Sequence, residues 1–178
     1  MNHPQPTTHN PQQQPTTHNS QLATCIMYSK EEASKLRQQF WITFGKYMKP
    51  IPSADGLPIN WINYKTGVKS IFFKMNAEQR KAMVAIEIAH PDPEMNRLYF
   101  ERFLTVRSLF LNTVGEDWNW EEQTKNEQGV NVSRISIELV DVSVYDPDNW
   151  PQLISFLKPR MMALDEFWTD VKPIFESL

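Results

Sequence analysis

The amino-acid sequence predicts an α+β protein, with a mostly antiparallel sheet of about five strands and helices packed on it. Two observations carry this prediction. Several segments have apolar residues at steps of three and four, as in amphipathic helices. Between them lie short runs rich in Val, Ile, Phe and Trp, paired around turn residues as in hairpins. The predicted order is α-β-β-β-α-β-β-α-α.

The first two long helices are predicted from their capping signals. One covers residues 29–49, because Ser29 and Glu32 have the spacing of a capping box before an apolar stripe. The other covers residues 92–114, since it begins with an aspartate and a proline and Gly115 follows it.

The end of the chain is predicted to form two helices, a short one after Asp146-Pro147 and a long one after Pro159. Apolar residues there recur at alternating steps of four and three, which gives one helical face. These residues are Leu157, Met161, Leu164, Trp168, Val171 and Phe175.

Five strands are predicted between the helices. Residues 59–64 and 68–75 are expected to form a hairpin around a turn at residues 65–67. The most apolar run, residues 82–90, reads as a buried strand. A second hairpin is predicted from residues 118–124 and 132–139, which flank a turn-rich segment.

Residues 1–26 are predicted to be a disordered low-complexity tail before a single domain over residues 27–178. The tail has no charged residue, and its segment Pro6–Asn10 recurs as Pro15–Asn19. It has too little apolar surface to offset the entropy of ordering it. Removal of the tail is therefore expected to leave the stability of the domain unchanged, and Met27 is an alternative start of translation.

Composition limits the classes of function. The chain of 178 residues carries 18 basic and 21 acidic side chains, which argues against binding of nucleic acid through overall positive charge. The single cysteine, Cys25, cannot form an internal disulfide. No apolar run approaches the ~18 residues of a membrane span, and no signal peptide is recognisable. The expected location is the cytoplasm, with no membrane partner.

Glu87 is the most informative charged residue of the predicted sheet. It lies in the middle of an apolar strand, on the face opposite Ile86 and Ile88. A buried carboxylate needs a partner, and Arg134 is expected to supply it because it lies in the middle of the last predicted strand. A structural ion pair is the favoured interpretation, and an active-site role is the alternative.

Motifs for catalysis are scarce. The predicted domain has one histidine, His90, and no cysteine, so a serine triad would have to use His90. Its glycines are isolated, which excludes phosphate-binding and dinucleotide-binding loops, and no metal site or cofactor is expected. A restriction-type nuclease needs an acid-x-Lys pattern, but alanine stands two residues after Glu87. The weak catalytic candidates are Glu87, Asp92, Arg134 and His90.

Two further groups are candidates for binding nucleic acid. Five basic residues lie around the first predicted hairpin, and a solvated hairpin explains them equally well. They are Lys65, Lys69, Lys74, Arg80 and Lys81. Trp118 and Trp120 share one face of a strand and could stack on bases, although core packing is the favoured interpretation.

Five stretches carry a family resemblance: Asn60–Gly67, Ile86–Ile88, Trp118–Trp120, Ser133–Ile135 and Trp150–Trp168. Through them the predicted domain resembles domain of unknown function 4268, a family found in bacteria and archaea. Family members occur alone or behind nuclease-like domains of defence and restriction systems, so the resemblance implies a nucleic-acid context. It transfers no catalytic residue to this chain.

The favoured hypothesis is a non-enzymatic binding or accessory module, linked by this resemblance to nucleic-acid processing and to a nuclease or restriction-type partner. One alternative is an atypical metal-dependent nuclease or hydrolase that uses Glu87. Another is a self-associating interaction domain that uses the aromatic and methionine-rich last helix. A basic groove would favour the first hypothesis, converging carboxylates the second, and a large symmetric apolar patch the third.

Overall fold

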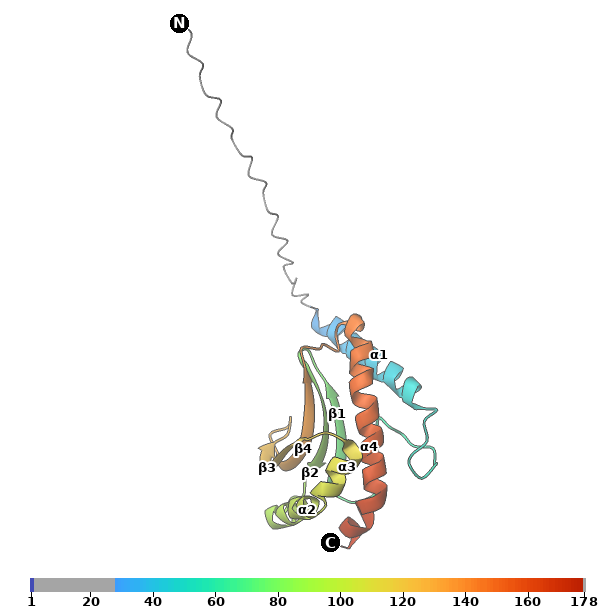
Figure 1. Cartoon of the computed structure of the whole chain (residues 1–178), viewed down its shortest axis with the longest axis vertical. Helices are drawn as coiled ribbons and strands as arrows, with labels where there is room; N and C mark the ends of the chain where they lie inside the picture. Colours follow the sequence, from blue (N-terminus) through green and yellow to red (C-terminus); the bar gives the residue numbers. More distant parts are fainter. Residues whose placement is uncertain (2–27, 178) are drawn as a thin grey trace.

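The computed structural model describes Met1 and residues 28–177, so the predicted tail lies outside the described residues except for Met1. The fold is α+β, as the sequence predicts, with one four-stranded antiparallel sheet (Figure 1). Its elements, in order, are α1 (Lys30–Met48), β1 (Ile71–Ala77), β2 (Lys81–Ile88), α2 (Pro93–Thr105), α3 (Arg107–Val114), β3 (Asn119–Lys125), β4 (Asn131–Val140), η1 (Pro147–Asn149) and α4 (Trp150–Glu176).

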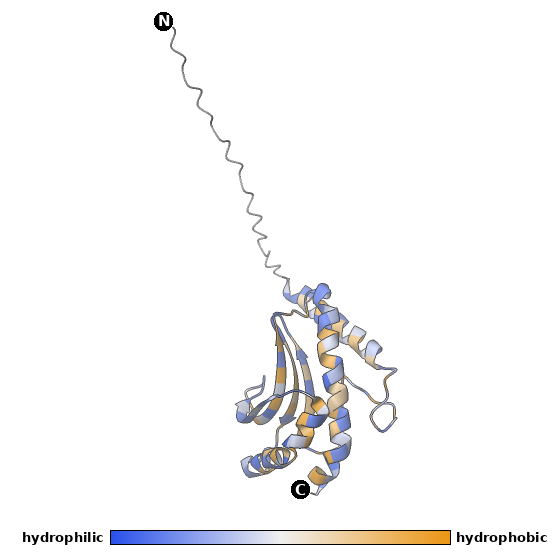
Figure 2. Cartoon of the chain, in the orientation of Figure 1, coloured by the Kyte–Doolittle hydropathy of each residue, from blue (hydrophilic) through white to orange (hydrophobic). Residues whose placement is uncertain are grey.

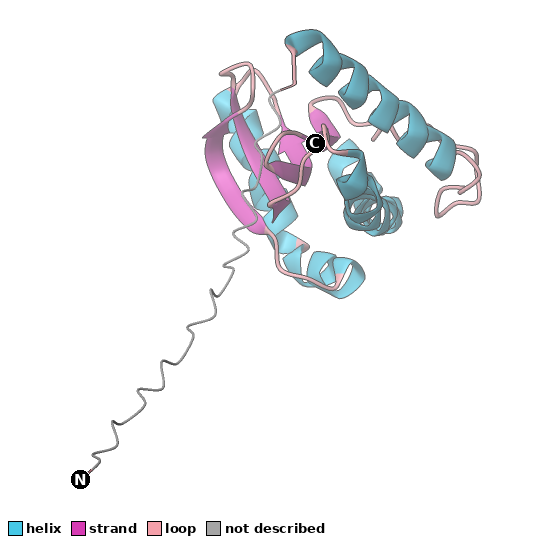
Figure 3. Ribbon diagram, turned by 90° about the horizontal axis from the view of Figure 1, so that it is seen from above, coloured by secondary structure: helices cyan, strands magenta, loops and turns pink. Residues whose placement is uncertain are grey.

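The sheet has the strand order β1-β2-β4-β3, and each neighbouring pair is antiparallel. In Figure 1, α1 and α4 lie on the same side of the sheet, and Figure 3 shows this arrangement from above. The core between these layers includes Val84, Ile86 and Ile88 of β2, Phe73 of β1 and Ile135 of β4. Burial of these side chains is the main favourable contribution to folding.

The predicted capping signals are confirmed. Ser29 and Glu32 form both hydrogen bonds of a capping box at the start of α1. The carboxylate of Asp92 accepts from the N–H of Glu94 at the start of α2. Gly115 has a φ of 76° and ends α3, where a residue with a side chain would be strained.

The helix predicted over residues 92–114 is divided into α2 and α3 at Val106, whose φ of −107° and ψ of 12° leave the helical range. The break allows aromatic residues before and after Val106 to pack against α4. Phe103 lies 4.3 Å from Phe175, and Phe110 lies 5.2 Å from Phe167, measured between ring centroids. Both partners belong to α4, so the turn at Val106 lets both helices pack against the same neighbour.

The predicted strand over residues 59–64 is wrong, and the sheet accordingly has four strands rather than about five. The side-chain oxygen of Asn60 accepts from the backbone N–H groups of Ile62 and Asn63, at 3.2 and 3.1 Å. This local turn replaces the ladder that a strand would need. The true first hairpin joins β1 and β2 through residues 78–80, not through residues 65–67.

The two helices predicted at the end of the chain are one helix, α4, which contains Pro159 and Pro173. A proline inside a helix costs roughly 3 kcal/mol. Here the continuous apolar face outweighs that cost, since Leu153 and Leu157 before Pro159 and Met161 after it are all fully buried. Much of the apolar face of α4 is thereby occupied within the protein core, and self-association through this helix stays a prediction.

Hydrophobic and hydrophilic residues alternate along α4, as expected of an amphipathic helix (Figure 2). No helix in residues 28–177 is long and apolar enough to cross a membrane.

The connection between α1 and β1, residues 49–70, is much longer than the few residues usual between elements. Two hydrogen bonds attach this connection to Asp165 of α4, a residue that is 3% exposed. The two carboxylate oxygens accept from the backbone N–H of Ala54 and from the hydroxyl of Tyr64, both at 2.6 Å. Burial, reinforced by this hydrogen bond, raises the pKa of Tyr64 far above its usual value. The hydroxyl therefore stays protonated and keeps donating.

A second attachment lies one helical turn further along α4. The indole N–H of Trp168 donates to the carbonyl of Thr66 at 2.8 Å, and the hydroxyl of Thr66 donates to the carbonyl of Ile71 at 2.8 Å. Gly67 has a φ of 81° and lies against the side chain of Lys172. These contacts place the start of β1 relative to α4.

Replacement of Tyr64 by phenylalanine is expected to lower the free energy of unfolding by about 1–3 kcal/mol, because one oxygen of buried Asp165 loses its donor. Urea unfolding measures the change. The control is Tyr47→Phe, at a tyrosine that is 51% exposed, where the expected change is within about 0.5 kcal/mol. Equal effects of both substitutions would contradict the role given to the Asp165 contact.

Candidate functional site

The sheet face that points away from α4 carries mostly polar side chains, and we call it the polar sheet face. Strand register places these side chains in rows, because residues two apart on a strand share a face. Row by row they are Phe72, Glu87, Arg134 and Glu121; Lys74, Ala85, Ser136 and Asn119; and Asn76, Met83 and Glu138. Phe72 and Lys74, at the β1 end of the first two rows, are exposed, and so is Asn119 of β3. At the centre of these rows, Glu87 of β2 and Ser136 of β4 are buried.

Glu87 and Arg134 form the ion pair that the sequence predicts. They are direct cross-strand neighbours, and a guanidinium nitrogen lies 3.4 Å from the carboxylate. Their side chains are 9% and 15% exposed, which is low for charged groups on the outer face of a sheet. Glu87 is thus paired with a cation within the structure, and its role in catalysis stays a prediction.

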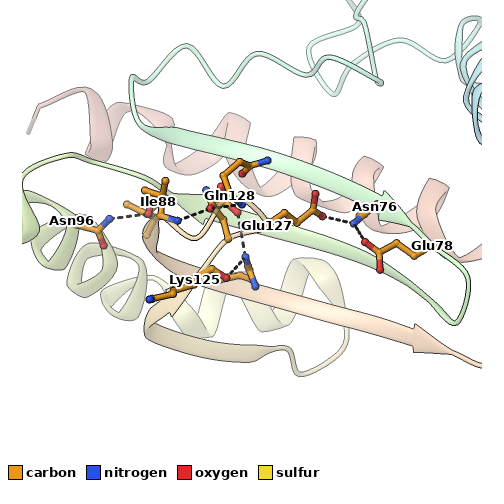
Figure 4. Close-up of polar contacts among 11 residues, drawn as sticks. Asn76, Glu78, Ile88, Asn96, Lys125, Glu127 and Gln128 are labelled. Atoms are coloured by element: carbon orange, nitrogen blue, oxygen red, sulfur yellow. Dashed lines mark hydrogen bonds and ion pairs between the residues drawn. The ribbon is translucent and has the colours of Figure 1, made fainter. Parts of the chain in front are cut away.

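The turn between β3 and β4 shields this ion pair. Figure 4 shows the turn folded back over the polar sheet face, with Glu127 beside Asn76 of β1. Asn76 donates to Glu127 and also, at 2.9 Å, to Glu78. The pairing register of β3 and β4 shifts between Glu121 and Thr124, and such irregularities bend a strand out of the plane of its sheet.

Arg134 is left with unused hydrogen-bonding capacity. A guanidinium has five N–H donors. Besides the carboxylate of Glu87, Arg134 donates only to the carbonyl of Lys125, at 3.3 Å, and its buried Nε–H has no partner among the described residues. Buried donors without acceptors are uncommon in proteins, and the indole N–H groups of Trp118 and Trp120 and the Nε–H of Arg160 share this property among the described residues.

Two hollows in the polar sheet face meet at Arg134. One, of about 230 Å³, lies under the folded turn and includes Lys81, Lys125, Glu78 and Glu127 among its lining residues. The other, of about 420 Å³, lies toward β3 and includes Asn119, Glu121 and Ser136. Both therefore present acidic and basic groups together, with Arg134 between them.

The other catalytic candidates serve local structure. A ring nitrogen of His90 accepts from the N–H of Asp92 at 3.0 Å, so His90 is a turn residue. The carboxylate of Asp92 caps α2, as described above. Within residues 28–177, no three side chains of His, Cys, Asp or Glu lie close enough together to hold a metal ion. A catalytic role for these candidates stays a prediction.

The five basic candidates are spread along the hairpin instead of forming one patch. Lys65 and Lys69 precede β1, Lys74 lies within it, and Arg80 lies in the turn at its other end. A strand of this length spans roughly 20 Å. Lys81 is paired with Glu138 at 2.6 Å. The role of these residues in binding nucleic acid stays a prediction.

Trp118 and Trp120 pack in the interior, which confirms the favoured interpretation. Trp118 is 3% exposed, and both rings meet Phe110 edge-on, at centroid distances of 5.3 and 5.6 Å. Arg107 covers the ring of Trp120. The two rings do not form an exposed platform for bases.

Sequence patterns gave no indication of two further hollows, on either side of Trp61. One, of about 570 Å³, lies between the connection and α4 and includes Asp165. The other, of about 370 Å³, lies between the connection and the end of α1. Both depend on the path of residues 49–70, which no local periodicity encodes.

The Glu87–Arg134 pair is expected to show a coupling of about 1 kcal/mol or more in a double-mutant cycle to alanine, because partial burial strengthens it. Urea unfolding of the two single variants and the double variant measures this coupling. Lys81 and Glu138 offer a matched control on the same two strands, closer at 2.6 Å but 47% and 41% exposed. Their coupling is expected to stay below about 0.5 kcal/mol. Additive effects at Glu87 and Arg134 would return Glu87 to the candidates for catalysis.

Comparisons with known proteins bear on the family and not on the chemistry. No curated protein and no solved structure matches the chain. A family model described as Domain of unknown function (DUF4268) matches residues 36–172, which confirms the resemblance that the sequence suggests. The match runs from α1 to the last part of α4 and includes the whole polar sheet face. The chain belongs to the DUF4268 family.

Proposed function

We propose that this protein is a non-enzymatic binding module that recognises a partner protein through its polar sheet face. One observation carries the proposal: Arg134 lies between two hollows of this face with donors that the protein itself does not use. Arginine is common at the centres of protein interfaces, since its planar group forms several directed hydrogen bonds at once. A partner's carboxylate or backbone carbonyl would complete its hydrogen bonding.

The acidic candidates already form contacts within the protein, which supports a binding role rather than catalysis. Glu87 is paired with Arg134, and Asp92 is used as a helix cap. A general base must reach the proton that it removes, and an ion-paired carboxylate with little exposure is poorly placed to do so.

The charge of the polar sheet face favours a protein over nucleic acid. The two hollows together include Glu78, Glu121, Glu127 and Glu138, which outnumber their basic residues. Such acids repel a phosphate backbone, whereas a protein can offer both charge signs in complementary positions. The nuclease or restriction-type partner implied by the family resemblance belongs to this class of ligand, and the cytoplasm is the proposed location.

A photo-reactive benzoylphenylalanine at position 72 is expected to crosslink one discrete partner protein in the native cells. Phe72 is 43% exposed and lies on the polar sheet face. The matched control is position 104 on α2, because Leu104 is 44% exposed and lies outside this face. A second substitution, Asn119→Arg, is expected to reduce the crosslink from position 72, since it adds bulk and charge to the far side of the face.

Two results would contradict this proposal. Equal crosslinking from positions 72 and 104 would remove the special role of the polar sheet face. Cleavage of DNA or RNA by purified protein with Mg²⁺ or Mn²⁺, abolished by Glu87→Gln, would make the nuclease alternative the better account.

A further inference from the structure

The hollow between α1 and the connection differs from the polar sheet face in its lining. From α1 it receives Gly45 and Lys46, and from the connection it receives Lys49 and residues 59–62. We call it the α1–connection hollow. Its volume of about 370 Å³ lies within the range of about 300–1,000 Å³ that is usual for sites of small ligands.

The apolar wall of the hollow is held in place. Trp61 is 2% exposed, and its indole N–H donates to the carbonyl of Ile51 at 2.9 Å. Ile59 and Ile62, which are partly buried, pack against the core on either side of it. Gly45 has no side chain, and a Cβ atom there would come within 3.4 Å of Ile62. A larger residue at position 45 would therefore fill the space.

The polar groups around the hollow are donors. Lys46 and Lys49 are exposed and form no ion pair with any residue in the described part of the chain. Asn60 uses its side-chain oxygen within its own turn, so its NH₂ group remains to donate. The hollow has no carboxylate in its lining, whereas the three other hollows described above each include at least one.

Apolar walls combined with two ammonium groups define the complementary ligand. Its apolar part must fit beside Trp61 and the two isoleucines, and an anionic group must reach the lysines at the rim. The two lysines also complement the negative end of the α1 dipole, which itself disfavours carboxylates at this end of the helix, but that role does not explain the apolar hollow beside them. We propose that the α1–connection hollow binds a small amphipathic carboxylate, an apolar chain or ring that ends in one carboxylate group.

Titration of isotope-labelled protein with sodium octanoate tests this site by two-dimensional NMR. The amide signals of residues 45–49 and 59–62 are expected to shift together and to saturate. The double variant Lys46→Ala/Lys49→Ala is expected to bind about tenfold more weakly or worse, because it loses both cationic partners. The control variant Lys65→Ala/Lys69→Ala removes the same charge elsewhere and is expected to bind octanoate like the natural protein.

Three further measurements decide the chemistry. Gly45→Leu is expected to abolish binding by filling the hollow, and its NMR spectrum shows whether the fold is kept. Octylamine, with the same chain and the opposite charge, is expected to bind at least about tenfold more weakly than octanoate. The proposal is overturned by octanoate binding that survives the loss of Lys46 and Lys49, by equal binding of octylamine, or by no shift of these amides. Tighter binding of a peptide that ends in Ile-Leu with a free C-terminal carboxylate would assign the hollow to the C-terminus of a protein chain instead. This site is separate from the polar sheet face, so either proposal can fail alone.

Discussion

The buried carboxylate of Asp165 is the contact on which the arrangement of the α1 side of the protein depends. It lies on the core-facing side of α4 and holds two points of the long connection, Ala54 and Tyr64, through neutral donors. Placing such a group in the interior costs free energy unless its hydrogen bonds are made, so the connection and the helix stabilise each other's position. Trp168 and Thr66 extend this attachment to the first residue of β1. The wall of the α1–connection hollow lies between these two points of the connection and is held by the hydrogen bond from Trp61 to Ile51.

The two faces of the sheet differ in what they bury and expose, and the proposed recognition belongs to the outer one. The inner face buries aliphatic and aromatic side chains against α4 and the aromatic residues of α2 and α3. The outer face includes a partly buried ion pair, a pair type whose desolvation cost can offset its attraction. The unused donors of Arg134 are the feature of this face on which the proposed binding of a partner rests. The folded turn over β1 shapes this face into two hollows instead of a flat surface.

Local signals in the sequence predicted much of the fold. The caps at Ser29 and Asp92, the end of α3 at Gly115 and the second hairpin depend on neighbouring residues, and all were predicted. The pairing of Glu87 with Arg134 followed from alternation along two strands. Two predictions differ from the structure for different reasons. At residues 59–64 the side chain of Asn60 forms a local turn that the apolar pattern does not reveal. At Pro159 the continuous core, a set of distant contacts, keeps the helix unbroken. The hollows and the unused donors of Arg134 arise from the folded turn and the long connection, which no periodicity reveals.

Hydrogen exchange of an Asp165→Asn variant tests the central role of Asp165 most directly. Asparagine keeps the size of the side chain, but an NH₂ group replaces one of the two accepting oxygens, so either the N–H of Ala54 or the hydroxyl of Tyr64 loses its acceptor. Amides within residues 51–66 are expected to exchange about tenfold faster or more, while the amides of β2 and β4 keep their protection. Unchanged protection of residues 51–66, or an equal loss of protection throughout the sheet, would contradict the account that Asp165 holds the connection in place.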